Sequence, residues 1–233
     1  MTKQEFINRV LLIMNEASMA DPSGSVFIGA DSAKIEKLIE GSFVEAWRRC
    51  VKVMPRTWFA NKSFSDAPLS TDLSNGTGFV ELPNDYYLLT SFKMRGWKKN
   101  VQDAIIANEQ IMAMQANMYV RGTQTRPICV IDMQDVNGEI KTVLRYYSLK
   151  EGLESHTVEQ AIYVPIVEPL TGVGLYTDLN LNKQVMEPLT YIAASTVFTM
   201  LEKKEAAKAL NAIAVEMFPG LESVKNGVPT IKQ

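Results

Sequence analysis

The stretch from Asp31 to Pro55, DSAKIEKLIEGSFVEAWRRCVKVMP, carries the clearest secondary-structure pattern in the chain. Its apolar residues recur every three or four positions, the spacing that places side chains on one face of an α-helix. They are Ile35, Leu38, Ile39, Phe43, Ala46, Trp47, Cys50, Val51 and Met54. Asp31 or Ser32 can cap the first turn, and Pro55 ends the helix because proline disfavours the α conformation in the residue before it. An apolar stripe of this length predicts a helix that is stabilised by packing against other elements.

A second helix is predicted before this one. Thr2-Lys3-Gln4-Glu5 fits a capping box, in which the Thr2 hydroxyl and the Glu5 carboxylate each accept from a free backbone N–H. Apolar residues at helical spacing then continue to about Ser18. The sequence therefore predicts two helices in the first 55 residues.

Helical patterns return near the C-terminal end. Pro188 suits a first helical turn, where its missing N–H costs nothing, and one apolar stripe then continues to Met200. A second stripe runs from Ala206 to Met217. The polar residues Glu202–Glu205 between them fit either a turn or a continuous helix. Pro219-Gly220 ends the pattern, and a polar tail follows.

Strand patterns separate the two helical regions. Between Arg56 and about Pro169, short runs rich in β-branched and aromatic residues alternate with turn residues, which is typical of strands. The runs are Gly78–Leu82, Tyr87–Met94, Ile128–Met133, Ile140–Tyr147 and Gln160–Val167. Asn137-Gly138 predicts a tight hairpin, because a type I′ turn needs positive φ at both central positions. Gly96-Trp97 is a second hairpin candidate, and a helix is expected from about Asn108 to Tyr119, with Ile111, Gln115, Met118 and Tyr119 on one face.

The order of elements predicts an α+β fold in which the terminal helices form a helical bundle and the antiparallel β-rich part is a central lobe. We expect residues 1–55 and 182–218 to form the bundle, because apolar helix faces must be buried against one another. Residues 56–170 form the β-rich lobe with one inserted helix. Residues 219–233 form an extended C-terminal tail, which either orders on a neighbouring chain or is a frayed end.

Composition excludes several classes of protein. The 233 residues are 46% hydrophobic with a net charge of −2, which suits a globular chain and argues against a globally basic nucleic-acid binder. A Cys/His zinc site needs about four ligands, but the chain has one histidine, His156, and two cysteines, Cys50 and Cys129. The cysteines are expected to be reduced. Because no run approaches about 20 apolar residues, we expect a soluble protein made in a cytoplasm, without membrane contact.

Candidate chemistry is sparse. His156 is expected in a solvated loop, and Cys50 is expected to be a core residue because it lies on the apolar stripe of its helix. Neither position requires a catalytic role. Asp132, Asp135 and Glu139 resemble a calcium loop only superficially, because their spacing differs from that of an EF-hand and they flank the predicted hairpin. Glu81 and Asp85, the nearest local carboxylate pair, fit a strand end and a turn. We therefore predict no catalytic, cofactor-binding or metal-binding residues, no cofactor, and a protein that is not an enzyme.

Two basic clusters remain open. Arg48, Arg49, Lys52 and Arg56 lie at the end of the second helix, where cations favour the helix dipole. Lys93, Arg95, Lys98 and Lys99 surround Gly96-Trp97. Each cluster fits a solvated surface, and each also fits a contact with phosphate or with an acidic partner.

The most specific stretch is Phe79 to Val101. A strand that ends in Leu82-Pro83-Asn84-Asp85, followed by an apolar strand, resembles the tail tubular protein A and head–tail connector (adaptor) proteins of tailed phages. Phe43 and Trp47 on the second helix, and the helical pair from Leu189 to Met217, are similar to that family as well. The motif covers about twenty residues, and the loop from Thr171 to Leu181 matches nothing in the family pattern.

This resemblance implies a structural virion protein. Members of such families form a homo-oligomeric ring of about twelve copies at the portal–tail junction, continue the DNA channel used in genome ejection, and dock downstream tail proteins. The implied partners are the chain itself, the portal protein, other tail or ring proteins, and DNA that passes through the lumen without sequence-specific binding. Two alternatives stay open: a virion-associated cell-wall-degrading enzyme, which needs a pair of carboxylates, and a monomeric adaptor that binds a cellular partner.

Overall fold

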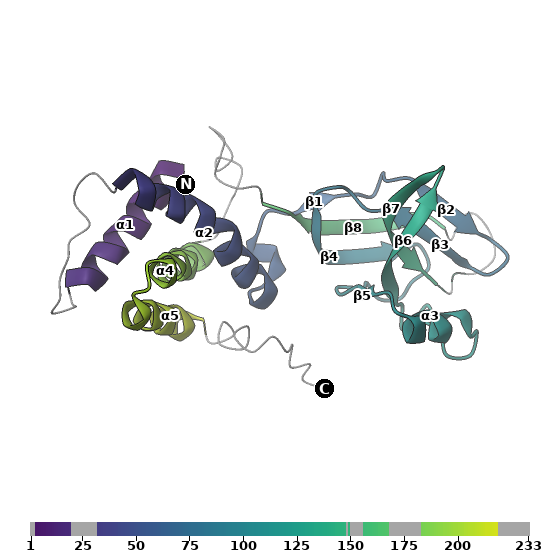
Figure 1. Cartoon of the computed structure of the whole chain (residues 1–233). Coiled ribbons are helices and arrows are strands. Elements are labelled where there is room, and N and C mark those ends of the chain that lie inside the picture. The colour runs from purple at the N-terminus through teal and green to yellow at the C-terminus, as the bar shows by residue number, and fades with distance from the viewer. Residues whose placement is uncertain (1–2, 20–31, 148, 150–155, 168–182, 219–233) are drawn as a thin grey trace. The chain divides into compact units, whose positions relative to one another are not determined.

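The computed structural model describes residues 3–19, 32–147, 149, 156–167 and 183–218. It confirms the α+β class, with helices at both ends of the chain and strands between them (Figure 1). The chain divides into two compact units, one of residues 1–60 and 167–233 and one of residues 61–166. The sequence placed the β-rich lobe at 56–170.

The first unit, the helical unit, contains the long helices. They are α1 (Lys3–Met19), α2 (Ser32–Val53), α4 (Lys183–Met200) and α5 (Lys204–Met217), with a 3₁₀ turn at Arg56–Trp58. Helix α4 contacts α1, α2 and α5, so it is the central element of this unit. Its apolar character explains this position, because Leu189, Ile192 and Val197 are all fully buried.

Aromatic side chains join α1 to α2, and α2 to the segment after the 3₁₀ turn. Phe6 and Phe43 pack edge to face with ring centroids 5.2 Å apart. Trp47 packs edge to face on Phe59, with centroids 6.2 Å apart. The stripe residue Cys50 is buried as predicted.

The predictions for α4 and α5 need one correction. Pro188 lies inside α4, five residues after its first residue, so the prediction that it occupies the first turn was wrong. The question left open at Glu202–Glu205 is answered by a turn between the helices. Glu202 has φ +61°, and the Lys203 N–H donates to the Phe198 carbonyl at 2.9 Å, which closes α4.

The second unit, the β unit, contains two sheets. The three-stranded sheet has the order β1 (Lys62–Ser63), β8 (Val158–Pro165), β4 (Tyr86–Met94). The five-stranded sheet has the order β2 (Leu69–Asp72), β3 (Thr77–Glu81), β7 (Glu139–Tyr146), β6 (Cys129–Val136), β5 (Ile105–Ile106). All described strand pairs are antiparallel except β5 with β6.

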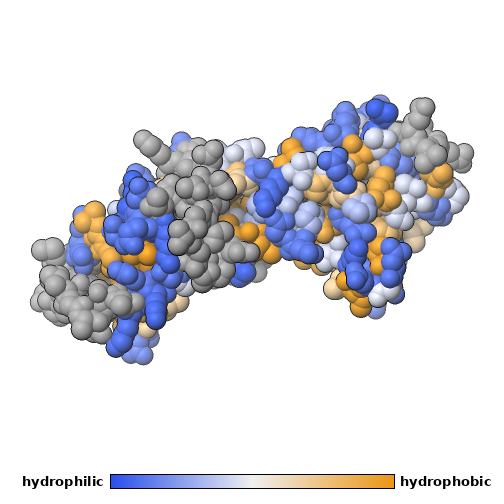
Figure 2. All heavy atoms as spheres, turned by 90° about the horizontal axis from the view of Figure 1, so that it is seen from above, coloured by the Kyte–Doolittle hydropathy of each residue, from blue (hydrophilic) through white to orange (hydrophobic). Residues whose placement is uncertain are grey.

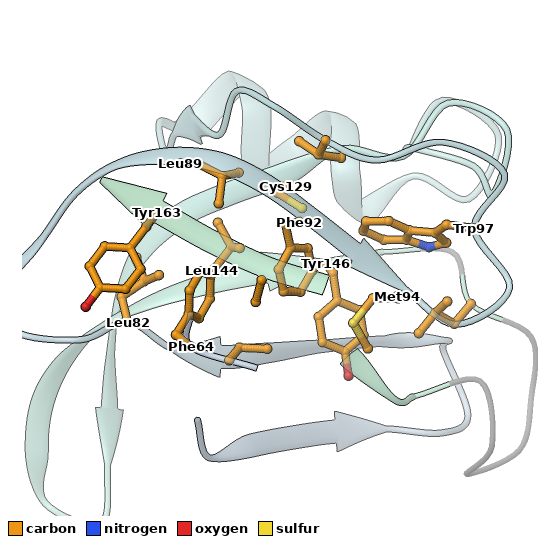
Figure 3. Packing of buried hydrophobic residues seen from close by; sticks show 14 residues of the cluster. Phe64, Leu82, Leu89, Phe92, Met94, Trp97, Cys129, Leu144, Tyr146 and Tyr163 are labelled. Carbon is orange, nitrogen blue, oxygen red and sulfur yellow. The ribbon is translucent and has the colours of Figure 1, made fainter. Parts of the chain in front are cut away.

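The two sheets share one core, shown in Figure 3. Phe64, which follows β1, stacks on Phe92 of β4 at 6.0 Å and packs edge to face on Tyr163 of β8 at 5.7 Å. Leu144 and Tyr146 enter the same cluster from β7. The strands of both sheets therefore bury their apolar faces against each other.

Five of the strands lie where the sequence predicted them, within about two residues at their starts. The Asn137-Gly138 hairpin is confirmed: these residues have φ +56° and +85°, and Val136 pairs with Glu139. At Gly96 (φ +90°) the chain turns back, so that Phe92 and Val101 form an antiparallel bridge.

The inserted helix α3 (Glu109–Ala116) is shorter than predicted. It ends at Asn117, whose side-chain oxygen accepts from the Tyr119 N–H at 3.0 Å and so competes with the helical hydrogen bond. Met118 and Tyr119 are exposed beyond it rather than lying on a helix face. The capping residues Thr2 and Asp31 and the tail 219–233 lie outside the described residues, so those predictions stand untested.

Candidate functional site

The Leu82–Asp85 motif forms the link between the two sheets of the β unit. It begins where β3 ends and delivers the chain to β4, which belongs to the other sheet. The Tyr86 N–H donates to the Pro83 carbonyl at 2.9 Å, so Pro83–Tyr86 is a β-turn with Pro83 as its first residue. The motif therefore has a structural role in joining the sheets.

Asp85 fastens this link to two other strands. Its carboxylate accepts from the Tyr163 hydroxyl of β8 at 2.6 Å and forms an ion pair with the Lys62 ammonium of β1 at 2.7 Å. Burial by itself raises the pKa of Asp85, but the hydrogen bonds from Lys62 and Tyr163 and the Lys62 charge outweigh it and leave the pKa below its usual range. Asp85 is thus an ionised carboxylate held by partners, which is unsuited to a general acid.

A pocket of about 710 Å³ lies beside this turn. Its apolar lining comes from Pro68, Leu82, Pro83, Tyr86 and Ile140, and its polar lining includes Glu81 and Lys141. Glu81 forms an ion pair with Lys141 at 2.9 Å, and the hydrogen bond to Glu81 raises the pKa of that lysine. Glu81 and Asp85 are therefore each bound to a lysine.

Large apolar side chains are exposed around the β6–β7 hairpin. Ile140 is 74% exposed and Met133 is 68% exposed. Their positions in the antiparallel ladder, Met133 opposite Thr142 and Ile140 opposite Asp135, place both on one face of the hairpin. We call these two residues the hairpin surface.

A second exposed apolar segment follows α3. Met118, Tyr119 and Val120 are consecutive, and Tyr119 is 90% exposed. Gly122, which follows this segment by two residues, lies beside Ile128, the residue before β6. Cys129 at that end of β6 pairs with Tyr146, whereas Ile140 lies at the hairpin end of β7. This 118–120 segment is therefore distinct from the hairpin surface. Figure 2 shows hydrophobic residues exposed among hydrophilic ones on one face of the β unit.

His156 is buried, so the prediction of a solvated loop histidine was wrong. It is 3% exposed, and its Nδ1 lies 3.0 Å from the Tyr146 hydroxyl. Burial lowers the pKa of His156, against an opposing effect of the Asp72 charge. The sequence around His156 does not predict its burial, because the residue that it contacts, Tyr146, lies on β7.

The remaining predicted candidates have structural partners. Burial raises the pKa of Cys50 to about 12 and that of Cys129 well above its usual value, so neither is an activated thiol. Asp132 pairs with Arg145 at 2.8 Å, and Asp135 accepts from the Gly138 N–H at 2.8 Å within the hairpin turn. Among the described residues, no three acidic, histidine or cysteine side chains gather as metal ligands.

Two of the structural contacts were not visible in the sequence. Tyr163 and Lys62 hold Asp85 although they lie 78 and 23 residues away from it. The exposed Met118–Val120 segment could have been found, because three consecutive large apolar residues beside the polar run Arg121–Arg126 are unusual in a solvated loop.

None of the helices in the described part of the chain is both long and apolar enough to span a bilayer. The sequence matches no known protein-family model and no curated protein.

Proposed function

We propose that this chain is a structural virion protein that forms a ring between the portal and the tail of a tailed phage. In this role it continues the DNA channel and docks downstream tail proteins. The order of helices, strands and helices supports the proposal, as does the Leu82–Asp85 motif, which occupies the link between the two sheets of the β unit.

The observation that carries the proposal is the pair of separate exposed apolar surfaces on the β unit. A ring assembled head to tail needs two different surfaces on each subunit, because each subunit contacts one neighbour with one face and the next neighbour with another. The hairpin surface lies on β6 and β7 and the 118–120 segment follows α3, so they provide two separate regions of this kind. Neighbouring exposed apolar side chains become a contact surface when a partner continues the apolar area, and this is the role we assign to the two regions.

The geometry disfavours the wall-degrading alternative. Glycoside hydrolysis needs one carboxylic acid that stays protonated near neutral pH and a second carboxylate. Glu81 and Asp85 are each paired with a lysine, and the pKa of Asp85 is lowered rather than raised.

The test is the mass of the purified protein in solution, alone and mixed with portal rings. Twelve subunits of 26.0 kDa give a ring of about 312 kDa. Ile140→Glu places a charge on the hairpin surface and should prevent ring formation, while Ile140→Val, which keeps an apolar side chain, should assemble normally. Because Ile140 is mostly exposed, neither change should alter subunit stability by more than about 0.5 kcal/mol.

Two results would contradict the proposal. If the protein stays monomeric at all concentrations and does not bind portal rings, the result would favour the monomeric cellular adaptor. Cleavage of cell-wall polymers that is lost in Glu81→Gln would favour the enzyme.

A further inference from the structure

Two cationic loops of the β unit lie side by side. Residues 95–99 follow β4, and residues 121–126 follow α3; the Lys98 N–H donates to the Gln124 carbonyl at 2.9 Å and joins them. The two loops contain five cationic residues, which are Arg95, Lys98, Lys99, Arg121 and Arg126. Four of these are exposed and Arg121 is half-buried. We call them the cationic surface.

The first loop is held rigidly. Trp97 is 3% exposed and packs edge to face on Phe92 with centroids 5.8 Å apart, so the loop is anchored in the core between its basic residues. On the far side of the turn, Phe92 and Val101 exchange two backbone hydrogen bonds of 2.8 Å. The basic side chains of this loop therefore project from a backbone that is already ordered.

The second loop is equally constrained. Thr123 and Arg126 exchange two backbone hydrogen bonds of 3.0 and 3.1 Å, which close a tight turn. The Gly122 N–H donates to the side-chain oxygen of buried Gln115 at 2.9 Å, and a Cβ at Gly122 would lie 2.9 Å from the Ile128 nitrogen. Because both loops are already ordered, binding of a ligand would not carry the entropy cost of ordering them.

The charge of the cationic surface is not neutralised by the described protein. None of its five residues forms an ion pair within the described ranges, and the neighbouring Glu159 is bound to Lys93 at 2.8 Å. From Arg95 to Arg126 the sequence has five cations against two carboxylates, Asp103 and Glu109, although the whole chain has a net charge of −2. Such local segregation of positive charge marks a surface for a polyanion.

We propose that the cationic surface binds the phosphate backbone of double-stranded DNA without reading its sequence. The choice of DNA among polyanions rests on the proposed ring function, in which DNA passes through the assembly. Arginine and lysine side chains bind phosphate oxygens through charge-assisted hydrogen bonds, and each contact releases a condensed counterion from the DNA. The loops offer no exposed aromatic residue and no helix for base readout, so the contact is electrostatic.

The test measures binding of a fluorescent 30-base-pair duplex by anisotropy between 50 and 200 mM NaCl. If all five residues contact phosphate, the dependence of log K on log salt has a slope of about −4.5, so that the affinity falls several-hundred-fold over this range. The triple variant Lys98→Gln, Lys99→Gln, Arg126→Gln should reduce the slope to about −2.

A matched control removes the same number of positive charges, but from the helical unit. Arg9→Gln, Lys37→Gln, Lys204→Gln also replaces one arginine and two lysines, all exposed, and should leave the slope unchanged. Circular dichroism checks that each variant is folded. If the triple variant does not fold, the double variant Lys98→Gln, Lys99→Gln is used in its place.

Two outcomes would overturn the proposal directly: no DNA binding at 50 mM salt, or an unchanged slope in the loop variant. A protein that binds poly-glutamate but does not bind DNA would also overturn it, because the partner would then be an acidic protein. The mass of each sample is measured in the same buffers. Ring formation without DNA binding would reject this inference alone, whereas DNA binding by a permanent monomer would reject the ring.

Discussion

Among the residues that the structure describes, Trp47 is the largest fully buried side chain. It contacts Phe59, which follows the 3₁₀ turn after α2. The apolar stripe of α2 predicted its burial, because it lies on the same helix face as Phe43 and Cys50. An indole in such a place contributes both buried apolar area and packing contacts.

Trp47→Ala should lower the free energy of unfolding by about 3–5 kcal/mol, because it removes a buried aromatic ring and leaves a cavity. Trp47→Phe should cost less, since it keeps a ring on the same face. Urea denaturation followed by circular dichroism measures both values. A loss below about 1 kcal/mol for the alanine variant would show that this core is not as close-packed as the structure indicates.

His156 predicts a pH dependence of stability. Its pKa in the folded protein is lowered below the ordinary value of 6.5, chiefly by burial. The folded state thus favours the neutral ring, so its contribution to stability is complete above pH 6.5 and is lost as the pH falls through the lowered pKa. The unfolding free energy of the wild type should therefore decline between pH 7.5 and 5.5.

The variant His156→Gln has no titrating ring and should show a flatter profile over the same range. The measurement is the urea midpoint at several pH values, above the range in which carboxylates titrate. Parallel profiles for the two proteins would mean that His156 is not the group responsible. His156→Ala is a poorer test, because it leaves the Tyr146 hydroxyl without its partner.

At the scale of elements, the β6–β7 hairpin depends on backbone conformation at its turn. Gly138 has φ +85°, and a Cβ there would meet no atom within 4 Å. Any cost of adding a side chain is therefore a cost of backbone strain alone. Gly41 in α2 offers the same open space with a helical backbone.

Gly138→Ala should destabilise the protein by about 1–2 kcal/mol, while Gly41→Ala should stabilise it by about 0.5–1 kcal/mol. Both changes add one methyl group to open space, so the opposite signs isolate the backbone term. Thermal melting measures both. Equal effects of the two changes would contradict the assigned turn.

At the scale of the whole molecule, the β unit has the features of an insertion. Its first strand, β1, pairs with its last strand, β8, so the chain enters and leaves this unit at adjacent positions, with Lys62 opposite Tyr163. The unit also contains its own core. Adjacent ends and an independent core are what allow a domain to be inserted into another.

The fragment from Asn61 to Ile166 should therefore fold by itself. Its near-ultraviolet circular dichroism should show ordered aromatic residues, and its urea unfolding should be a single cooperative transition. A fragment that has secondary structure but unfolds without cooperativity would show that the β unit needs the helical unit for its stability.

The sequence alone determined those elements whose signals are local. The stripe of α2, the five longer strands and the Asn137-Gly138 hairpin follow from periodicity and from turn residues that few other conformations accept. These signals need no knowledge of the rest of the chain, and they were sufficient for the α+β class.

The tertiary structure alone decided what depends on distant partners. Strands β1 and β5 have two residues each, too few for a periodic pattern, and exist through pairing with β8 and β6. Three contacts likewise join residues that lie 10 to 78 positions apart in the sequence. They are His156 with Tyr146, Asp85 with Tyr163, and Lys98 with Gln124. Local pattern cannot predict such pairs, because the free energy that selects them comes from contacts formed when the chain is folded.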